Sequence, residues 1–127
     1  VKMDSLLILK HPVITANSKL SFVFNADSNK EFVYFITDGK YVKIGKANNV
    51  YKRLKQLQTG SASILKVLLC VNVTDSYKAE NKLHKLFQDK NVNNEWFDIL
   101  DNFKSSVVLK NIEEFNPIID LAGWFYQ

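Results

Sequence analysis

The chain has 127 residues, of which 46% are hydrophobic and 24% are charged, and its formal net charge is +4 at pH 7. This length and composition are typical of a single globular domain rather than a disordered or fibrous protein. The sequence contains no apolar run of membrane-spanning length and no signal-like opening segment, so we expect no membrane association. The net charge is too small to indicate a nucleic-acid partner by itself.

The cysteine and histidine content limits the cellular compartment and the kind of metal site that we expect. Cys70 is the only cysteine, which excludes a disulfide within the chain and favours a reducing compartment. We therefore expect an intracellular protein, located in the cytoplasm or in the nucleus. With one cysteine and only His11 and His84 as histidines, the sequence offers no ligand set for a zinc site.

Residues 1–30 are expected to form an N-terminal arm. Two short apolar runs, residues 5–9 and 20–24, are typical of strands, and Pro12 breaks the chain between them. These strands would extend or cover the sheet of the main domain, which we assign to residues 31–127.

The segment that follows the arm is predicted to form a β-hairpin. Asp38-Gly39 between two alternating runs indicates a two-residue type I′ turn, which needs a positive φ at both positions. That turn would place Tyr34 directly opposite Lys43, with Cβ atoms roughly 4.5–5.5 Å apart. We expect Arg53 and Glu80 to lie at this same face of the hairpin. Because side chains alternate along a strand, one face of the hairpin would be wholly apolar. Its residues are Val33, Phe35, Val42 and Ile44.

An amphipathic helix with a basic surface is predicted next. Asn48 or Asn49 would cap its N-terminus, and Gly60 would follow its last turn. The apolar stripe of the helix is Val50, Leu54 and Leu57. Six cations and no acid occur between residues 40 and 55: Lys40, Lys43, Lys46, Lys52, Arg53 and Lys55, of which Arg53 is the only arginine of the chain. We expect nucleic acid to bind here, through Tyr41, Lys46, Lys52 and Lys55.

A buried strand and a second helix are predicted after Gly60. Residues 64–73 are almost all apolar, which favours a strand buried on both faces at the centre of the sheet. A helix capped by Thr74 or Asp75 should then run to about residue 88. Its inward positions would be Ala79, Leu83 and Leu86, and an adjacent stripe would carry Tyr77, Glu80 and His84.

The remaining segments complete the predicted fold. Residues 91–94 should form a polar loop, and residues 101–115 a third helix that buries Phe103, Val107 and Phe115. The aromatic tail, residues 118–127, would pack back on the domain; the alternative is a partner surface, such as the contact of a homodimer. These elements predict an α/β (α+β) fold with a small, mainly antiparallel β-sheet flanked by helices.

Five sequence elements occur in a fixed order. They are Val33-Tyr34-Phe35, Lys43-Ile44-Gly45, Arg53, Glu80 four residues before His84, and Glu95-Trp96-Phe97. In this order and spacing the chain resembles the GIY-YIG endonuclease superfamily. It resembles most the branch named after a phage reading frame, whose second motif reads KIG and whose later elements read E-x-x-x-H and EWF. The resemblance covers about residues 31–99 and implies a GIY-YIG-like fold in a phage or viral protein.

The resemblance also implies an activity, that of a metal-dependent DNA endonuclease that hydrolyses phosphodiester bonds. In that reading Glu80 is the sole carboxylate ligand of Mg²⁺ (or Mn²⁺), a cation that retains much of its water. Arg53 would stabilise the negative charge of the transition state. His84 would contact phosphate, orient Glu80 or pack in the core. No specificity domain is visible in the sequence, so DNA targeting would depend on a partner domain.

The general base stays open between two residues, because Lys43 stands where the commoner family pattern has a second tyrosine. Tyrosine and lysine both have an ordinary pKa near 10, which must fall to about 7 for action at neutral pH. Arg53 and a divalent cation are expected to lower both pKa values. We expect neutral Lys43 and Tyr34 to position and deprotonate the attacking water together.

Each of these readings has an alternative. Tyr34 and Lys43 would be an ordinary pair on a solvent-facing sheet, Arg53 a solvated cation, and Glu80 an exposed acid on its helix. At the level of function, the main alternative is a catalytically inactive nucleic-acid-binding module of the same fold. A third class is a protein-interaction domain that uses the aromatic tail.

Overall fold

The computed structural model describes residues 30–119. The predicted strands of the N-terminal arm and most of the aromatic tail, with its alternative role as a dimer surface, lie outside the described residues. None of the helices in the described part of the chain is long and apolar enough to cross a membrane.

Residues 30–119 form a six-stranded antiparallel sheet with three α-helices, which confirms the predicted fold class. The strands follow the order β4-β5-β2-β1-β3-β6 across the sheet. Their bounds are β1 Glu31–Thr37, β2 Val42–Ala47, β3 Lys66–Val73, β4 Asn91–Asn93, β5 Trp96–Phe97 and β6 Ile118–Ile119. The helices are α3 Val50–Thr59, α4 Ser76–Leu86 and α5 Ser105–Asn111, with short 3₁₀ helices η1 Gln88–Lys90 and η2 Glu113–Phe115.

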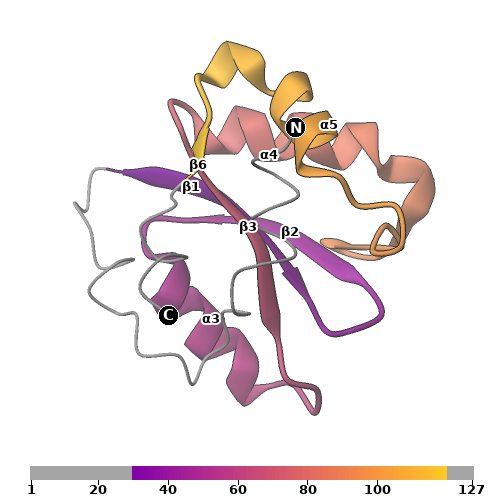
Figure 1. Cartoon of the computed structure of the whole chain (residues 1–127). Coiled ribbons are helices and arrows are strands. Elements are labelled where there is room, and N and C mark those ends of the chain that lie inside the picture. Colours follow the sequence, from indigo (N-terminus) through magenta and orange to yellow (C-terminus); the bar gives the residue numbers. More distant parts are fainter. Residues whose placement is uncertain (1–29, 120–127) are drawn as a thin grey trace.

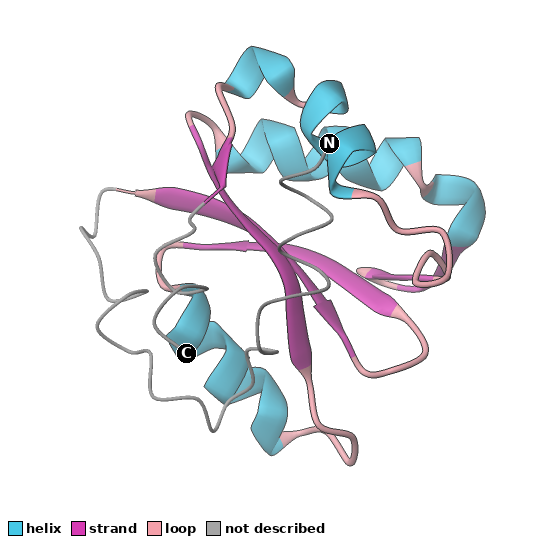
Figure 2. Ribbon diagram, in the orientation of Figure 1, coloured by secondary structure: helices cyan, strands magenta, loops and turns pink. Residues whose placement is uncertain are grey.

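Helices cover both faces of the sheet, and each face has its own core (Figures 1 and 2). On one face, Phe32, Tyr34 and Ile36 of β1 pack with Val50 and Leu54 of α3. On the other face lie the four apolar hairpin residues predicted from the alternation, which pack with α4 and α5. Tyr34 therefore lies on a face buried by α3 and not on a solvent-facing sheet, and its side chain is 1% exposed.

The hairpin forms where it was predicted, but its register is shifted by two residues. Tyr34 is paired with Gly45, and Lys43 with Ile36, so Tyr34 and Lys43 are not directly opposite each other. A two-residue shift keeps every side chain on its face, so Tyr34 and Lys43 still share one. The prediction of direct opposition is wrong, whereas the shared face is correct.

The shape of the turn explains the shift. The carboxylate of Asp38 accepts hydrogen bonds from the backbone N–H groups of Lys40 and Tyr41, at 2.9 and 2.8 Å, which widens the loop to four residues. The hydroxyl of Thr37 donates to the Tyr41 carbonyl and closes the loop from the strand side. Gly39 has a φ of 98°, but Asp38 does not have the positive φ that a type I′ turn needs.

The two helix N-termini were predicted correctly, because each has a capping side chain of the expected kind. Asn49 Oδ1 accepts from Lys52 N–H at the start of α3, and Asp75 Oδ1 accepts from Lys78 N–H at the start of α4. Gly60 follows α3 as predicted, although its φ of −100° is not left-handed.

Several predictions for the second half of the chain need correction. Leu86 is 40% exposed and Val107 is 45% exposed, so neither is an inward position; Val108 and Ile112 take the core position expected of Val107. The third helix is shorter than predicted, because a 3₁₀ turn replaces its end. Residues 91–94 form β4 and a turn rather than a loop, with Asn94 at a φ of 49°.

The central strand of the sheet is β1, and not β3, which forms from the residues predicted to lie at the centre. β1 pairs along its length with both β2 and β3, whereas the outer partner of β3 is the two-residue strand β6. β3 is nevertheless largely buried on both of its faces, as its apolar sequence indicated.

Glu31 ties the start of β1 to the start of α4. Its Oε1 accepts hydrogen bonds of 2.8 Å from both the backbone N–H and the hydroxyl of Ser76. These two bonds lower the pKa of Glu31 below its ordinary value of 4.5. The carboxylate also lies at the positive end of the α4 dipole.

We therefore expect Glu31 to make stability depend on acidity. Because the folded-state pKa is lowered, the stabilisation is present above the ordinary pKa and is lost as the pH falls through the folded value. At pH 7, Glu31→Gln should lower the free energy of unfolding by roughly 1 kcal/mol, and the deficit should vanish at low pH. Urea unfolding at several pH values measures this, with exposed Glu113→Gln as the control. A deficit that does not change with pH would contradict the role of the charge.

Candidate active site

The side chain of Tyr34 extends from β1 over the neighbouring strand β2. Its pairing partner Gly45 has no side chain, and a Cβ built there would overlap the hydroxyl and ring of Tyr34, with Cε1 at 2.9 Å. Glycine at the end of the KIG motif is therefore required by close contact rather than by backbone conformation. The Tyr34 ring lies over Gly45, and its hydroxyl is directed across β2.

The pKa of Tyr34 is raised, not lowered as the sequence suggested. Burial is the largest cause, since it disfavours the phenolate. A hydrogen bond from Arg53 and its positive charge lower the pKa, and the charges of Glu95 and Glu80 raise it further. Arg53 lowers the pKa as predicted, but burial outweighs the guanidinium in the protein without a bound cation. The predicted effect of a divalent cation on this pKa stays a prediction.

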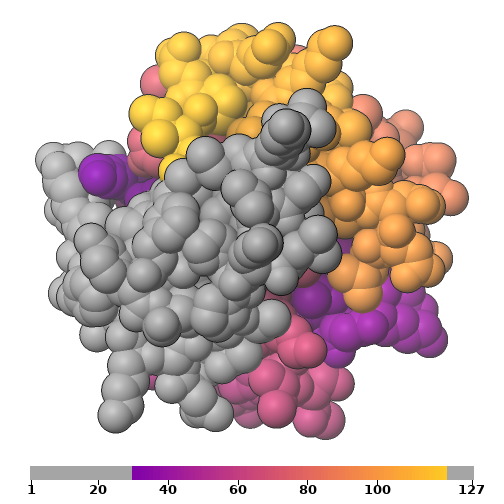
Figure 3. All heavy atoms as spheres, viewed as in Figure 1, coloured from indigo at the N-terminus to yellow at the C-terminus, as the bar shows by residue number. Residues whose placement is uncertain are grey.

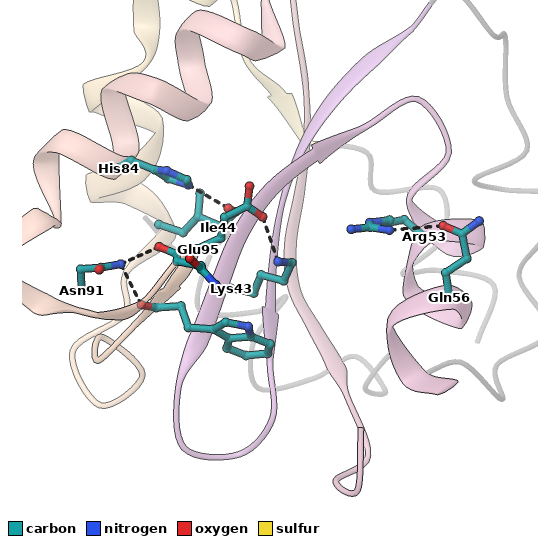
Figure 4. A network of polar contacts seen from close by, with 9 residues as sticks. Lys43, Ile44, Arg53, Gln56, His84, Asn91 and Glu95 are labelled. Atoms are coloured by element: carbon teal, nitrogen blue, oxygen red, sulfur yellow. Dashed lines mark hydrogen bonds and ion pairs between the residues drawn. The ribbon is translucent and has the colours of Figure 1, made fainter. Parts of the chain in front are cut away.

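Arg53 reaches this site from α3. Its guanidinium interacts with the Tyr34 hydroxyl, and its Nη1 donates to Gln56 Oε1 at 3.4 Å (Figure 4). The side chain is therefore not simply a solvated helix cation. The backbone N–H of Arg53 belongs to the first turn of α3 and bonds to the Asn49 carbonyl, so the Asn49 cap fixes where the side chain starts.

Lys43 is buried beside Glu95. The two side chains form an ion pair of 2.8 Å, with Lys43 Nζ also 5.8 Å from the centre of the Trp96 ring. Figure 4 shows the pair between the α4 side and the α3 side of the sheet. Pairing of β2 with β5 creates this contact, because Lys43 is opposite Trp96 and Glu95 directly precedes that strand.

Glu80 enters from the opposite face of the sheet. α4, which carries it, packs on the face away from Tyr34, so the prediction that Glu80 shares the face of Tyr34 is wrong. The charge of Glu80 nevertheless raises the pKa of Tyr34, and the charges of Lys43 and Lys46 of β2 lower the pKa of Glu80. Glu80 is 7% exposed, so it is not an exposed helix acid, and no hydrogen bond or ion pair engages its carboxylate within residues 30–119.

The electrostatics around Glu80 are those of a carboxylate lacking a close cation. Burial raises its pKa, and the negative charge of Glu95 raises it further. His84, Lys46 and Lys43 lower it by their charge, but less. Glu80 and Glu95 are therefore two acids from different elements that face the same small region.

His84 lies between the KIG segment and β5. Its Nε2 lies 2.9 Å from the carbonyl of Ile44, and because a carbonyl only accepts, Nε2 carries the proton. The ring packs on Phe97 at 5.1 Å between centres. Glu95 binds the other side of the same residue, since its carbonyl accepts from Ile44 N–H. His84 and Glu95 together hold the KIG segment.

The predicted nucleic-acid-binding residues are only partly brought together. Lys46 is exposed near the end of β2, where its charge acts on Glu80, and Lys52 and Lys55 are exposed on α3. Lys55 Nζ lies 5.0 Å from the centre of the Tyr51 ring. Tyr41 is half-buried in the hairpin loop, at the opposite end of β2 from Lys46.

Comparison with known families identifies the domain. A model of the T5orf172 domain matches residues 31–116, which is more than half of the chain. The chain belongs to the T5orf172 domain family. This is a phage-associated domain related to GIY-YIG and HNH-like nucleases. Searches of curated proteins and of solved structures found no significant match.

All the candidate residues lie inside the matched part of the T5orf172 domain. Tyr34, Lys43 and Arg53 come from β1, β2 and α3, and Glu80 and His84 from α4. The residue that sequence reasoning undervalued is Glu95, which holds Lys43 and adds negative charge beside Glu80. Only its place in the EWF element pointed to it, because the pairing of β5 with β2 has no local signal.

Proposed function

We propose that this T5orf172 domain is a metal-dependent DNA endonuclease of the GIY-YIG type, which hydrolyses phosphodiester bonds. One observation supports the proposal most. Around β2 the fold gathers a tyrosine hydroxyl beside an arginine, a lysine paired with an acid, and a buried carboxylate that has no bonded partner among residues 30–119. These are Tyr34, Arg53, Lys43, Glu95 and Glu80. Such a set suits a reaction in which a phosphate gains negative charge.

The residues fit a divalent cation at Glu80. A buried carboxylate with a second acid nearby and no hydrogen-bond partner is stabilised when a cation neutralises it. Within the described residues no three His, Cys, Asp or Glu side chains converge, so Mg²⁺ or Mn²⁺ would be held by Glu80, phosphate oxygens and water. When bound, the cation supplies Lewis-acid stabilisation of the leaving oxygen.

Arg53 and Tyr34 act on the phosphate together. The guanidinium is a planar donor that engages two phosphate oxygens at once, and it stays charged at every working pH. Its hydrogen bond to Gln56 and its nearness to the Tyr34 hydroxyl limit the directions it can take before DNA arrives, which limits the reorganisation needed during the reaction. Tyr34 in its neutral form holds the attacking water by its hydroxyl.

Lys43 needs Glu95 in order to act as a base. An ammonium group that donates to a carboxylate has no lone pair, so it takes no proton from water. If one Lys43 proton passes to Glu95 across 2.8 Å, the amine nitrogen becomes free to accept the proton of the attacking water. Glu95 is then the acceptor of the displaced proton, and Tyr34 positions the water.

The decisive assay is nicking or linearisation of plasmid DNA by the full chain with Mg²⁺ or Mn²⁺. We expect cleavage, and binding that weakens with salt because lysines release counterions from phosphates. Tyr34→Phe and Lys43→Ala then identify the base. If Lys43→Ala cleaves normally and Tyr34→Phe does not, the tyrosine is the base. The reverse result identifies Lys43 as the base.

The second candidate is a binding module that has lost catalysis. Two observations favour it: burial raises the Tyr34 pKa, and an ion pair occupies Lys43, so neither is a ready base. Salt-dependent DNA binding without cleavage under any divalent metal would establish this candidate and remove the enzyme proposal.

A further inference from the structure

A groove lies beside the candidate active site, between the end of α3 and the hairpin loop. Its volume is about 540 Å³. The lining includes Asp38 of the loop, Gln56 and Leu57 of α3, Ser61 and Ser63 of the α3–β3 connection, and Trp96 of β5. Figure 3 shows the end of the hairpin in violet and the α3–β3 connection in rose, adjoining at the lower right of the surface.

The chemistry of the groove differs from that of the basic surface around it. Trp96, Leu57 and Leu65 supply an aromatic and aliphatic wall, whereas the rim has uncharged amide and hydroxyl groups. Among the described residues that line it there is no lysine or arginine, and Asp38 is the one with a charge. A phosphate is repelled by such a site, while a flat, neutral group with a polar edge fits it.

Two contacts join the groove to the residues proposed to act on the phosphate. Lys43 Nζ lies 5.8 Å from the centre of the Trp96 ring. At the other side, Gln56 Oε1 accepts from Arg53. A nucleotide whose phosphate is held by Arg53 therefore has its neighbouring base within reach of the groove.

The wall formed by the α3–β3 connection is held in place by its own hydrogen bonds. Gln58 donates to the Ser63 carbonyl at 2.8 Å and accepts from Leu65 N–H at 2.8 Å. Ser61 Oγ donates to the same Ser63 carbonyl at 2.9 Å. The site is therefore formed before a ligand arrives, which lowers the cost of binding.

We propose that the groove binds the base of the nucleotide next to the scissile phosphate, stacked on Trp96 and contacted at its edge by Gln56. The inference rests on the proposed function and specifies its substrate. A base inside a duplex stack cannot enter a groove of this kind, so the nucleotide beside the cut is unpaired or extruded. The substrate class is then DNA with an unpaired nucleotide at the cleavage position.

The test measures binding with a metal chelator present, so its result does not depend on cleavage. Each position of a short single-stranded DNA is replaced in turn by an abasic nucleotide. For the wild-type chain we expect one position at which loss of the base weakens binding roughly 5- to 100-fold, the scale of base stacking on an aromatic ring. In Trp96→Leu and in Gln56→Ala, the abasic effect at that position should shrink while the salt dependence is unchanged.

Matched variants separate base binding from general effects. Gln88→Ala removes an exposed glutamine on η1, away from the groove, and should keep the wild-type abasic pattern. Lys55→Gln should weaken all DNAs equally and reduce the salt dependence. If Trp96→Leu does not fold, the abasic effect in Gln56→Ala tests the proposal by itself, because Gln56 is exposed and outside the core.

A fluorescence readout reports the contact directly. Trp96 and Trp124 are the two tryptophans, so Trp124→Phe leaves Trp96 as the single reporter. Intact DNA should quench it, and DNA abasic at the critical position should not. Equal binding and quenching for every abasic DNA would overturn the groove proposal even in a chain that cleaves. A base-dependent contact in a chain that never cleaves would overturn the enzyme proposal alone.

Discussion

Replacement of Glu80 by glutamine should abolish DNA cleavage while DNA affinity stays within a few-fold of wild type or improves. The amide keeps the size of the side chain but provides no charge to hold a divalent cation, so the loss should be roughly a thousand-fold or more, the upper scale for losing an electrostatic contribution to the transition state. Binding does not need this acid, which repels phosphate. Glu80→Ala should give the same result.

Stability separates this effect from misfolding. Glu80 is a buried carboxylate that has no bonded partner in residues 30–119, and removing its charge should leave the thermal midpoint unchanged or higher. Exposed Glu113→Gln should cleave at the wild-type rate. Cleavage by Glu80→Gln at a rate close to wild type would take Glu80 out of the site and remove the reason to place a metal there.

Replacement of Arg53 by lysine should lower turnover by roughly a hundred- to a thousand-fold, although the charge is kept. Lysine replaces a planar two-pronged donor with a single point donor, and it also loses the fixed geometry that the Tyr34 contact gives the guanidinium. DNA affinity should change little, because other cations remain on the same surface, among them Lys46, Lys52 and Lys55.

Single-turnover cleavage at saturating enzyme is the suitable measurement, because it excludes binding and product release. Lys52→Arg, the neighbouring exposed position on α3, is the matched control and should cleave normally. A rate for Arg53→Lys within threefold of wild type would show that Arg53 is only a helix cation.

The sequence alone was sufficient for the local parts of this fold. Asn49 and Asp75 cap the two helices because a short polar side chain is the group that satisfies free N–H groups there. The alternating apolar pattern of the hairpin predicted which residues share each face, because a register shift of two residues leaves every side chain on its own face. The order of motifs was enough to indicate the family.

Most features that only the tertiary structure determined depend on contacts between segments far apart in the chain. The hairpin register is a local exception, because it followed from the Asp38 side chain, whose two bonds to the loop compete with the type I′ turn that its sequence favours. The need for glycine at position 45 became visible only when the Tyr34 ring was placed over it.

The same holds for the charges of the site. The pKa of Tyr34 depends on how deeply α3 buries it, and no spacing in the sequence measures burial. Glu95 meets Lys43 because the two-residue strand β5 pairs with β2, a contact between residues about fifty positions apart with no local pattern. Glu80 reaches the edge of β2 from the other face, since the packing of Ala79 and Leu83 directs α4 there. Local chemistry determined which residues were candidates; burial and strand pairing determined which of them meet.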